Sequence, residues 1–557
     1  MNIQRLLPIV ALALTPSWSF AQTTERLNLS GGAEANDRSI NPECSVDGRF
    51  VVWQTLASNV VPGDTNGTWD VFLLDRQTGV TELVSRTSQG TPANGFSVEP
   101  SISDNGRYVA FRASAPDLVP GTNAGLYLYD RILKNVVLAS PSSSHATTIS
   151  KNPALSRTGR YVVFSCDRPL IAADTNARDD VYRYDRVTDS VELVSRDINS
   201  VQSTQDSLSA SVSEDGRFVV FETLSSTWGA AFTGTRHIWR KDMLSGALEC
   251  ISTDSLGNPA VGLSRNPVLA ADGSWAAFET VASNLVIVNG AQQIVAKNLV
   301  TGETRQVTLN DAGQPANNYS YEPEISADGR FVKFRSAANN FHMGGTNAYY
   351  SLFMRDLRLG ITRKVSLTAA GLSNDEDCDV GDVSVTGRFI VFSSKSTSLV
   401  AGDTNAFEDI FLRDRFGDGT YTYGWSPQQS IGCLPYIEAL GTPSASAGSG
   451  FDINLVNVRG AVPGILIYSK SGPTAIPVFG SNLYVAAPTI RTSVQVSSGT
   501  VGQCNGSFSF DFNSHVAGGS DGGLGSGTPV WAQYWSRDVG SSGGSHLSDA
   551  LAFVLGV

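Results

Sequence analysis

The sequence is poor in basic residues and in long apolar stretches, and each shortage excludes a class of partner. Lys and Arg number 40 against 52 Asp and Glu, which gives a formal net charge of −12 at pH 7. Nucleic acids and anionic membranes require a basic protein surface, so we expect neither as a partner. After the N-terminal residues no stretch approaches the roughly 18 apolar residues of a membrane-spanning helix, so we expect no membrane insertion.

Catalytic and metal-binding motifs are also scarce. The five histidines form neither an HExxH motif nor a pair at metal-ligand spacing. Two Gly-x-Ser-x-Gly matches, at Ser520 and Ser542, lie in Gly/Ser-rich text and not between a strand and a helix, where a nucleophile elbow lies. The sequence therefore predicts no catalytic residue, and it favours a non-enzymatic protein.

Cysteine is rare, and no two cysteines form a CxxC zinc motif. Cys433 and Cys504 lie in the same C-terminal region, and we predict a disulfide between them. For the other four cysteines the sequence leaves the pairing open: they are Cys44, Cys166, Cys250 and Cys378.

The N-terminus has the pattern of a secretory signal peptide. Arg5 supplies the charge, an apolar run follows to Leu14, and Ser19-Phe20-Ala21 forms a small-x-small cleavage site. We predict a signal peptide over residues 1–21, cleaved after Ala21. The mature protein is then periplasmic, on the cell surface or extracellular.

Glycine is abundant, and it marks an internal repeat. It recurs at positions 48, 106, 159, 216, 273, 329 and 387, at intervals of 53 to 58 residues. Around it the text is similar, as in Ser-Val-Asp-Gly-Arg-Phe-Val-Val-Trp at 45–53, with aromatic residues two and five positions after each glycine. We expect Asp-Gly to form a two-residue hairpin turn between two strands, because glycine tolerates φ > 0.

Two more strands follow in each repeat, such as residues 70–76 and 80–85. Four antiparallel strands repeated radially make a β-propeller. Residues 24–30 read as a fourth strand without the first three, whereas the seventh repeat lacks its own fourth strand. We therefore predict an all-β, seven-bladed β-propeller closed by its N-terminal strand. A six-bladed ring with one spare repeat is the alternative.

The Asp-Gly-Arg-aromatic core resembles the TolB-like, or WD40-like, propeller repeats of secreted bacterial proteins over about residues 23–425. The resemblance implies the architecture and not a function, because that fold hosts binding scaffolds, lyases and peptidase gates.

The text changes after the repeats, and apolar stretches then alternate with Gly/Ser-rich turns. We predict a propeller over 22–425, a linker over 426–440 and a small β-sandwich over 441–557. The segment Gln533-Tyr534-Trp535-Ser536-Arg537-Asp538, followed by Asp549-Ala550, resembles a small β-domain at the C-termini of large secreted bacterial proteins, and this resemblance implies no activity.

Three repeats carry Asp-Thr-Asn-x-x-x-Asp in the loop between their second and third strands. These oxygen ligands are candidates for weak Ca²⁺ sites, although Ca²⁺ takes about six to eight ligands and no glutamate closes the loop. Asx turns, in which the side chains bond their own backbone, are the favoured alternative. The residues are Asp64, Asn66 and Asp70; Asp174, Asn176 and Asp180; and Asp403, Asn405 and Asp409.

The long loops indicate where a partner binds. A repeat takes about 56 residues, against about 40–45 in a compact WD40 blade, and the excess lies in two loops that emerge on one face. Ser, Thr, Asn, Asp and Gly dominate them, which favours a protein or glycan partner. We therefore expect an exported binding or scaffold protein of unspecified oligomeric state. The alternative is a propeller-type polysaccharide lyase or hydrolase with carboxylates in the central channel.

Overall fold

The computed structural model describes residues 23–556 except 140–150, 226, 229–233, 288–289, 342–348, 369–371, 380, 385–386, 416–420, 424–428, 431–432, 434, 479–480 and 542–543. The predicted signal peptide, residues 1–21, lies outside the described residues. Within the described part of the chain, no helix has the length and apolar character needed to cross a membrane.

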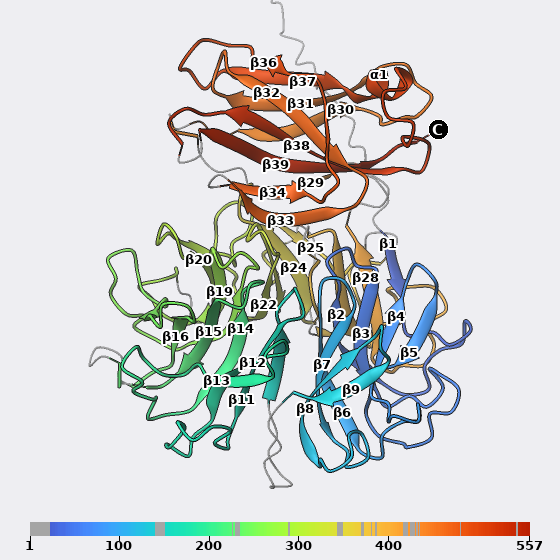
Figure 1. Ribbon diagram of the computed structural model, residues 1–557, viewed down its shortest axis with the longest axis vertical. Helices are drawn as coiled ribbons and strands as arrows, with labels where there is room; N and C mark the ends of the chain where they lie inside the picture. Colours follow the sequence, from blue (N-terminus) through green and yellow to red (C-terminus); the bar gives the residue numbers. More distant parts are fainter. Residues whose placement is uncertain are drawn as a thin grey trace, which may run out of the picture.

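Seven four-stranded antiparallel sheets form the blades of a propeller, and a second β-unit is stacked on one of its faces (Figure 1). In each blade the first strand lies innermost and the fourth outermost. The strands are β2 (Ser39–Cys44), β3 (Phe50–Thr55), β4 (Asp70–Asp75) and β5 (Val80–Leu83) in blade 1; β6 (Phe96–Ile102), β7 (Tyr108–Ser114), β8 (Ala124–Asp130) and β9 (Asn135–Leu138) in blade 2; β10 (Lys151–Leu155), β11 (Tyr161–Cys166), β12 (Asp180–Asp185) and β13 (Ser190–Leu193) in blade 3; β14 (Ser207–Val212), β15 (Phe218–Thr223), β16 (His237–Asp242) and β17 (Leu248–Cys250) in blade 4; β18 (Ser264–Leu269), β19 (Trp275–Thr280), β20 (Gln293–Asn298) and β21 (Thr304–Gln306) in blade 5; β22 (Ser320–Ile325), β23 (Phe331–Ser336), β24 (Ser351–Asp356) and β25 (Ile361–Lys364) in blade 6; and β26 (Cys378–Asp379), β27 (Phe389–Ser394) and β28 (Asp409–Asp414) in blade 7.

The N-terminal strand completes blade 7. β1 (Thr23–Arg26) pairs antiparallel with β28, with Thr23 opposite Asp414 and Arg26 opposite Phe411. The prediction of seven blades closed by the N-terminal strand is therefore confirmed. Because β1 supplies the fourth strand of blade 7, this blade has the same four strands as the others and β28 has no unpaired outer edge.

The Asp-Gly turn is wider than predicted. The Ser45 N–H donates to the Phe50 carbonyl (2.8 Å), and the Gly48 N–H donates to the Ser45 carbonyl (2.9 Å). Four residues, 46–49, therefore connect β2 and β3, and the prediction of a two-residue turn was wrong. The wider loop is held by Asp47, whose Oδ1 accepts from the Ser45 hydroxyl (2.8 Å) and the Arg49 N–H (3.0 Å). Gly48 has φ 68°, so the expectation that this position needs a glycine because of its positive φ is confirmed.

Each of these glycines also lies under an aromatic ring of the preceding blade. A Cβ on Gly106 would come within 2.0 Å of the Phe50 ring, and one on Gly48 within 2.5 Å of the Phe389 ring. In all seven blades the corresponding distance is 2.0 to 2.7 Å, which is too short for any side chain. The aromatic residue two positions after one glycine therefore packs on the glycine of the next blade.

Arginines cover these rings and join the strands of a blade. Arg49 forms a two-bond ion pair with Asp75 at the end of β4 (2.8 and 2.7 Å) and lies 4.6 Å from the Phe50 ring centroid. Arg131 of blade 2 lies over the other side of the same contact, 4.3 Å from that centroid. The recurring Asp-Arg at the end of the third strand is thus structural, as predicted. Blade 5 has neutral residues, Ser274 and Asn298, at the two ion-pair positions.

The C-terminal unit is a β-sandwich, as predicted. One sheet has the order β29-β39-β38-β32-β35, with β36 also on β32, and the other has β30-β31-β37. Their facing side chains, among them Phe451, Tyr468 and Tyr534, form one buried core. The elements are β29 (Tyr421–Tyr423), β30 (Tyr436–Gly441), β31 (Phe451–Val458), β32 (Pro463–Ser469), β33 (Pro473–Val478), β34 (Ser481–Val485), β35 (Ile490–Arg491), β36 (Gln495–Val496), β37 (Gly506–Asp511), α1 (Phe512–Ala517), β38 (Pro529–Arg537) and β39 (Ser545–Val554).

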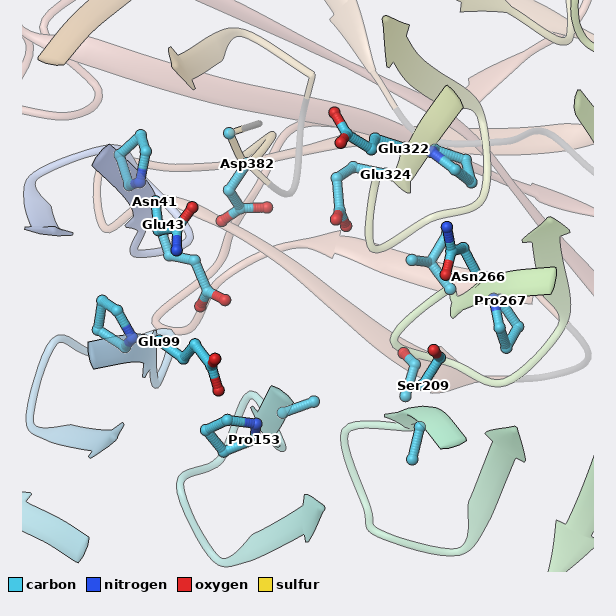
Figure 2. Close-up of a pocket in the computed structure, with 18 residues that line it drawn as sticks. Asn41, Glu43, Glu99, Pro153, Ser209, Asn266, Pro267, Glu322, Glu324 and Asp382 are labelled. Carbon is cyan, nitrogen blue, oxygen red and sulfur yellow. The ribbon is translucent and has the colours of Figure 1, made fainter. Parts of the chain in front are cut away.

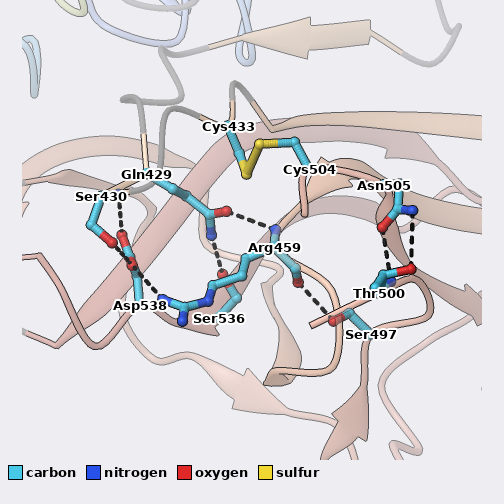
Figure 3. The surroundings of a disulfide bond; sticks show 10 residues. All are labelled: Gln429, Ser430, Cys433, Arg459, Ser497, Thr500, Cys504, Asn505, Ser536 and Asp538. Carbon is cyan, nitrogen blue, oxygen red and sulfur yellow. Dashed lines mark hydrogen bonds and ion pairs between the residues drawn. A yellow bond between two sulfur atoms is a disulfide. The ribbon is translucent and has the colours of Figure 1, made fainter. Parts of the chain in front are cut away.

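The connection between the two units is tied to the sandwich. β29 lies in the stretch predicted to end the propeller, yet it pairs with β39, so the crossover falls between Asp414 and Tyr421. The predicted disulfide between Cys433 and Cys504 is present, with Cα atoms 5.1 Å apart (Figure 3). Nearby, the Arg459 N–H donates to Gln429 Oε1 (2.8 Å). A disulfide across a loop of this length stabilises by about 2–4 kcal/mol.

The sandwich stands on the face of the propeller that carries the hairpins between strands 1 and 2 and between strands 3 and 4, called here the hairpin face. Arg358, in a strand 3–4 turn, forms an ion pair with the buried Asp549 of β39. Asn482 donates to Asp272, the residue before Gly273 (3.1 Å). The opposite face carries the long loops and is called the loop face.

We expect Gly106→Ala to destabilise the propeller more than Gly63→Ala. Both glycines have positive φ, 65° and 89°, so both substitutions carry the backbone cost of about 1 kcal/mol. Only at Gly106 would the added Cβ meet an aromatic ring, whereas around Gly63 nothing lies within 4 Å. Thermal unfolding of the two variants measures the difference, which overpacking sets at about 1–3 kcal/mol. Equal melting temperatures would show that the ring can move away and that the contact does not fix the blades.

Candidate functional site

A cavity of about 420 Å³ occupies the propeller axis and is lined by the innermost strands of the blades (Figure 2). Its lining comes mainly from residues five, six and seven positions before each turn glycine. Prolines occupy the middle position in five blades, and they fit there because the innermost strand is an edge strand with no inner partner for its N–H.

In blades 1, 2, 4, 5 and 6 a β-bulge accompanies the channel-lining residue that lies seven positions before the glycine. The pairing of the first two strands shifts register there, between Ile40 and Glu43 in blade 1. Five non-glycine residues at this position have left-handed backbone, with φ between 48° and 56°: Asn41, Glu99, Ser209, Asn266 and Glu322. Such backbone is unfavourable for glutamate and serine, and strain of this kind gathers at functional sites.

Carboxylates gather in one sector of this channel. Blades 6, 7, 1 and 2, which are consecutive around the ring, contribute five of them, and the blades opposite contribute Ser209, Ser211 and Asn266. Figure 2 shows the labelled acidic side chains around the cavity. The five are Glu43, Glu99, Glu322, Glu324 and Asp382.

Two of the five carboxylates also connect neighbouring blades. Glu43 Oε2 accepts the Ile102 N–H of blade 2, and Asp382 Oδ2 accepts the Cys44 N–H of blade 1, both at 3.1 Å. At the same position Ser101 and Ser211 accept the equivalent N–H groups of blades 3 and 5. Polar side chains five positions before the glycine therefore satisfy a backbone donor of the next blade.

Glu324 does not have this connecting role. The equivalent donor, the Val383 N–H, is taken by Asp382 Oδ1 (2.6 Å). Glu324 lies opposite the buried Lys333 in the strand register, and Lys333 donates to the Gly381 carbonyl. Burial raises the pKa of Glu324 to about 8 and lowers the pKa of Lys333. Burial, with the neighbouring charge of Asp382, also raises the pKa of Glu43 well above its usual value.

The hairpin end of the axis is closed. Backbone hydrogen bonds run from blade to blade there, from the Val46 N–H to the Asp104 carbonyl (3.3 Å) and from the Asp104 N–H to the Arg157 carbonyl (2.8 Å). Arg157 and Asp104 also form an ion pair (3.0 Å). Beyond this ring Pro473 and Thr474 of the β33–β34 hairpin help to line a second cavity of about 210 Å³. The sandwich therefore lies over this end of the channel.

The loop face carries both sets of long loops, as predicted. The loop between strands 2 and 3 and the loop entering the same blade are joined by asparagine side chains. Asn59 Oδ1 accepts the Asn36 N–H (3.0 Å) in blade 1, and Asn340 Oδ1 accepts the Asn317 N–H (3.2 Å) in blade 6. The residues with left-handed backbone lie nearer this face than those five before the glycine, because the innermost strands begin there.

The residues of the candidate Ca²⁺ sites lie in these loops and bond to the protein itself. In blade 1, Asn66 donates to Asp70 Oδ2 (2.6 Å) and the Ser85 hydroxyl donates to Asp70 Oδ1 (2.6 Å). Burial raises the pKa of Asp70 to about 7, that of Asp180 to about 6 and that of Asp403 to about 6.

The other two loops follow the same pattern. Ser195 donates to Asp180 Oδ1 (2.5 Å), Asn176 to the Ser203 carbonyl (2.9 Å), and Tyr182 to Asp174. In blade 7, Asn28 and Arg26 of the N-terminal segment donate to Asp409 (2.6 and 3.2 Å), Arg26 also pairs with Asp403 (3.1 Å), and Asn405 donates to the Ala35 carbonyl (3.0 Å). Over the described residues no group of three or more His, Cys, Asp or Glu side chains is placed to hold a metal ion.

Among the described residues, neither a histidine nor a serine of the Gly-x-Ser-x-Gly motifs lines the channel. His237 is buried in blade 4, where its Nδ1 lies 3.3 Å from the Ser252 hydroxyl. Ser520 lies in a loop of the sandwich, and His342 and Ser542 lie outside the described residues. The channel carboxylates were missed by the sequence analysis, although their fixed distance from the repeat glycine is a signal that marks them.

The fold and channel define a seven-bladed propeller capped on one face by a β-sandwich, and solved structures of similar architecture are propellers. No family model matches the sequence, and no curated protein matches it. TolB from Acinetobacter baumannii is 15% identical over 58% of this chain, with a TM-score of 0.33, and only 62% of TolB is spanned. The β-propeller domain of the Trilobed protease from Pyrococcus furiosus is 12% identical over 69% of this chain and 95% of the domain, with a TM-score of 0.45. These likenesses concern the fold alone.

We expect the stability of the protein to fall as the pH rises from about 5 to about 8. Between the usual pKa of 4.5 and the folded value of about 8, Glu324 binds a proton in the folded state that the unfolded state releases, so folding is favoured at low pH. Glu324→Gln should therefore raise stability at pH 8 by at least about 1 kcal/mol and flatten the pH dependence. Melting temperatures at constant ionic strength test this, with the exposed Glu376→Gln as control. Parallel curves for wild type and Glu324→Gln would contradict it.

We expect Ca²⁺ to change the melting temperature little. An ion at Asp174 or Asp403 has to displace the Tyr182 hydroxyl or the Arg26 guanidinium, and the Asp64 carboxylate accepts the backbone N–H of Asn66. A bound ion at a hundredfold excess over Kd would add about 2.7 kcal/mol of stability. The measurement compares millimolar CaCl₂ with EGTA at matched ionic strength. A rise of many degrees, abolished by Asp64→Ala with Asp403→Ala, would establish the sites as Ca²⁺ sites.

Proposed function

We propose that the protein is an exported, non-enzymatic binding protein that presents the loop face of its propeller to a protein or glycan partner. The sandwich is the base on which the propeller stands. The observation that carries this proposal is that the sandwich covers one face of the propeller and the long loops lie on the other. The hairpin face is contacted by the sandwich, whereas the loop face carries the long polar loops and the end of the channel that Glu99 and Glu322 line.

Export is supported by the disulfide. Disulfides form and persist in oxidising compartments, outside the cytoplasm. With the secretory pattern of residues 1–21, the Cys433–Cys504 bond favours the periplasm, the cell surface or the medium.

The lining of the channel favours binding over catalysis. The described residues that line it include carboxylates, serines and five prolines, and none of them is a histidine. Glu43 and Asp382 are engaged in the same backbone connections that serines make in other blades. A lyase or hydrolase remains the second candidate because Glu324, with its raised pKa, has the protonation state of a general acid.

A pair of matched leucines on opposite faces of blade 4 tests the proposal. Leu256, in a long loop of the loop face, is 85% exposed, and Leu244, in a strand 3–4 turn of the hairpin face, is 80% exposed. A photo-crosslinking amino acid at each position is introduced into the full chain in its producing cell. We expect adducts, to protein or glycan, from position 256 and not from position 244.

The same design applies to blade 6, where Leu372 lies on the loop face and Leu359 on the hairpin face, 66% and 59% exposed. Equal adducts from both faces, or none from the loop face, would contradict the proposed function. Depolymerisation of a polysaccharide that is abolished by Glu324→Gln would establish the enzyme in its place.

A further inference from the structure

Three tyrosine rings lie next to one another on the loop face at blade 6. The rings of Tyr319 and Tyr321 are parallel within 3°, with centroids 6.0 Å apart. The Tyr350 ring lies 6.0 Å from that of Tyr321, tilted by 50°. Tyr319 precedes β22, Tyr321 is its second residue and Tyr350 precedes β24, so all three lie at the loop-face ends of strands.

This surface, the tyrosine platform, is accessible to solvent. Tyr319 is 45% exposed, and Tyr321 and Tyr350 are partly exposed. Tyr321 is followed directly by Glu322, which lines the channel, so the platform borders the acidic cavity. Exposed aromatic rings in a row are a costly surface for a soluble protein unless a ligand covers them.

The charges around the platform are paired with one another. Arg265 lies 6.0 Å from the Tyr321 centroid and pairs with Glu279 (2.8 Å). Arg335 lies 4.4 Å from the Tyr350 centroid and pairs with Asp379 (2.8 Å) and, more distantly, with Glu322 (3.8 Å). The edges of the platform are therefore polar, and their positive and negative charges balance one another.

We infer that the tyrosine platform binds a neutral glycan, whose sugar rings pack on the exposed ring of Tyr319 and against the parts of Tyr321 and Tyr350 that the arginines leave exposed. This inference rests on the proposed function and names the ligand class for the loop face. The C–H faces of a pyranose are apolar and pack on aromatic rings, while its hydroxyls need the donors and acceptors that Arg335, Asp379 and Glu322 provide.

Other ligand classes fit this surface less well. A cation would meet Arg265 and Arg335, which already lie over two of the rings. An anion would meet the carboxylates of Glu322, Asp377 and Asp379. The core of a protein interface is depleted of charged residues, whereas here charges alternate with the rings.

Affinity gel electrophoresis of the full mature chain tests the inference. The gels contain one soluble neutral polysaccharide each, namely hydroxyethyl cellulose, glycol chitin, amylose, xylan or galactomannan, with alginate and polygalacturonate as anionic counterparts. We expect retardation by at least one neutral polysaccharide and by neither anionic one. Tyr319→Ala and Tyr350→Ala should each raise the dissociation constant obtained from the retardation about tenfold.

Conservative and remote variants separate ring stacking from loss of fold. Tyr319→Phe and Tyr350→Phe keep the ring and should retain most of the binding. Phe407→Ala removes a 39% exposed aromatic of blade 7 on the same face and should change nothing. No retardation in any gel, retardation by anionic polysaccharides only, or retardation unchanged in Tyr319→Ala and Tyr350→Ala would each overturn the inference. Crosslinks from Leu256 to a protein alongside any of these results would leave the proposed function standing.

Discussion

The contact between an aromatic ring and a glycine without room for a side chain determines the arrangement of this propeller. The ring of one blade covers the turn glycine of the next, and the last such contact, Phe389 on Gly48, joins blade 7 to blade 1. In six of the seven contacts two arginines lie over the ring, and one of them also forms an ion pair within its blade, as Arg49 and Arg131 show at Phe50; over the Trp275 ring of blade 5 lies Arg305. Because the contact repeats with one geometry, the angle between blades repeats too, and the ring closes at seven.

This contact explains why so much of the fold could be predicted. It requires a glycine and an aromatic residue at a fixed spacing, so every repeat carries both, and the number of repeats follows from the sequence. The role of the N-terminal strand could be predicted because residues 24–30 have the pattern of a fourth strand that the seventh repeat lacks. The length of the turn could not be predicted from Asp-Gly alone, because it depends on the serine hydroxyl and the Asp47 carboxylate, which favour a wider loop. The docking of the sandwich could not be predicted either, since Arg358 and Asp549 are distant in sequence and belong to no motif.

The channel, unlike the contacts between blades, could not be predicted from residues that recur in every repeat. Its lining positions are fixed by the repeat, but their side chains differ from blade to blade, from Glu43 through Ala154 to Asp382. A comparison of the repeats looks for residues that recur, so it does not detect these positions. A ligand without seven-fold symmetry, however, requires different side chains at equivalent positions of the blades. The tyrosine platform is likewise confined to one blade. The seven-fold frame supplies rigidity, and the individual blades supply the chemistry.

The strand that closes the ring is the first to be synthesised and the last to find its partner. β1 holds the first described residues, yet its partner β28 is made only after six blades have been completed. Because a chain is made from its N-terminus, the closing segment exists before there is anything for it to close. Until β1 pairs with β28, the outer edge of β28 is unpaired and the propeller is an open arc that another chain can enter. The strand that closes the ring is thus also the reason that an incomplete propeller keeps an open edge until its last blade has formed.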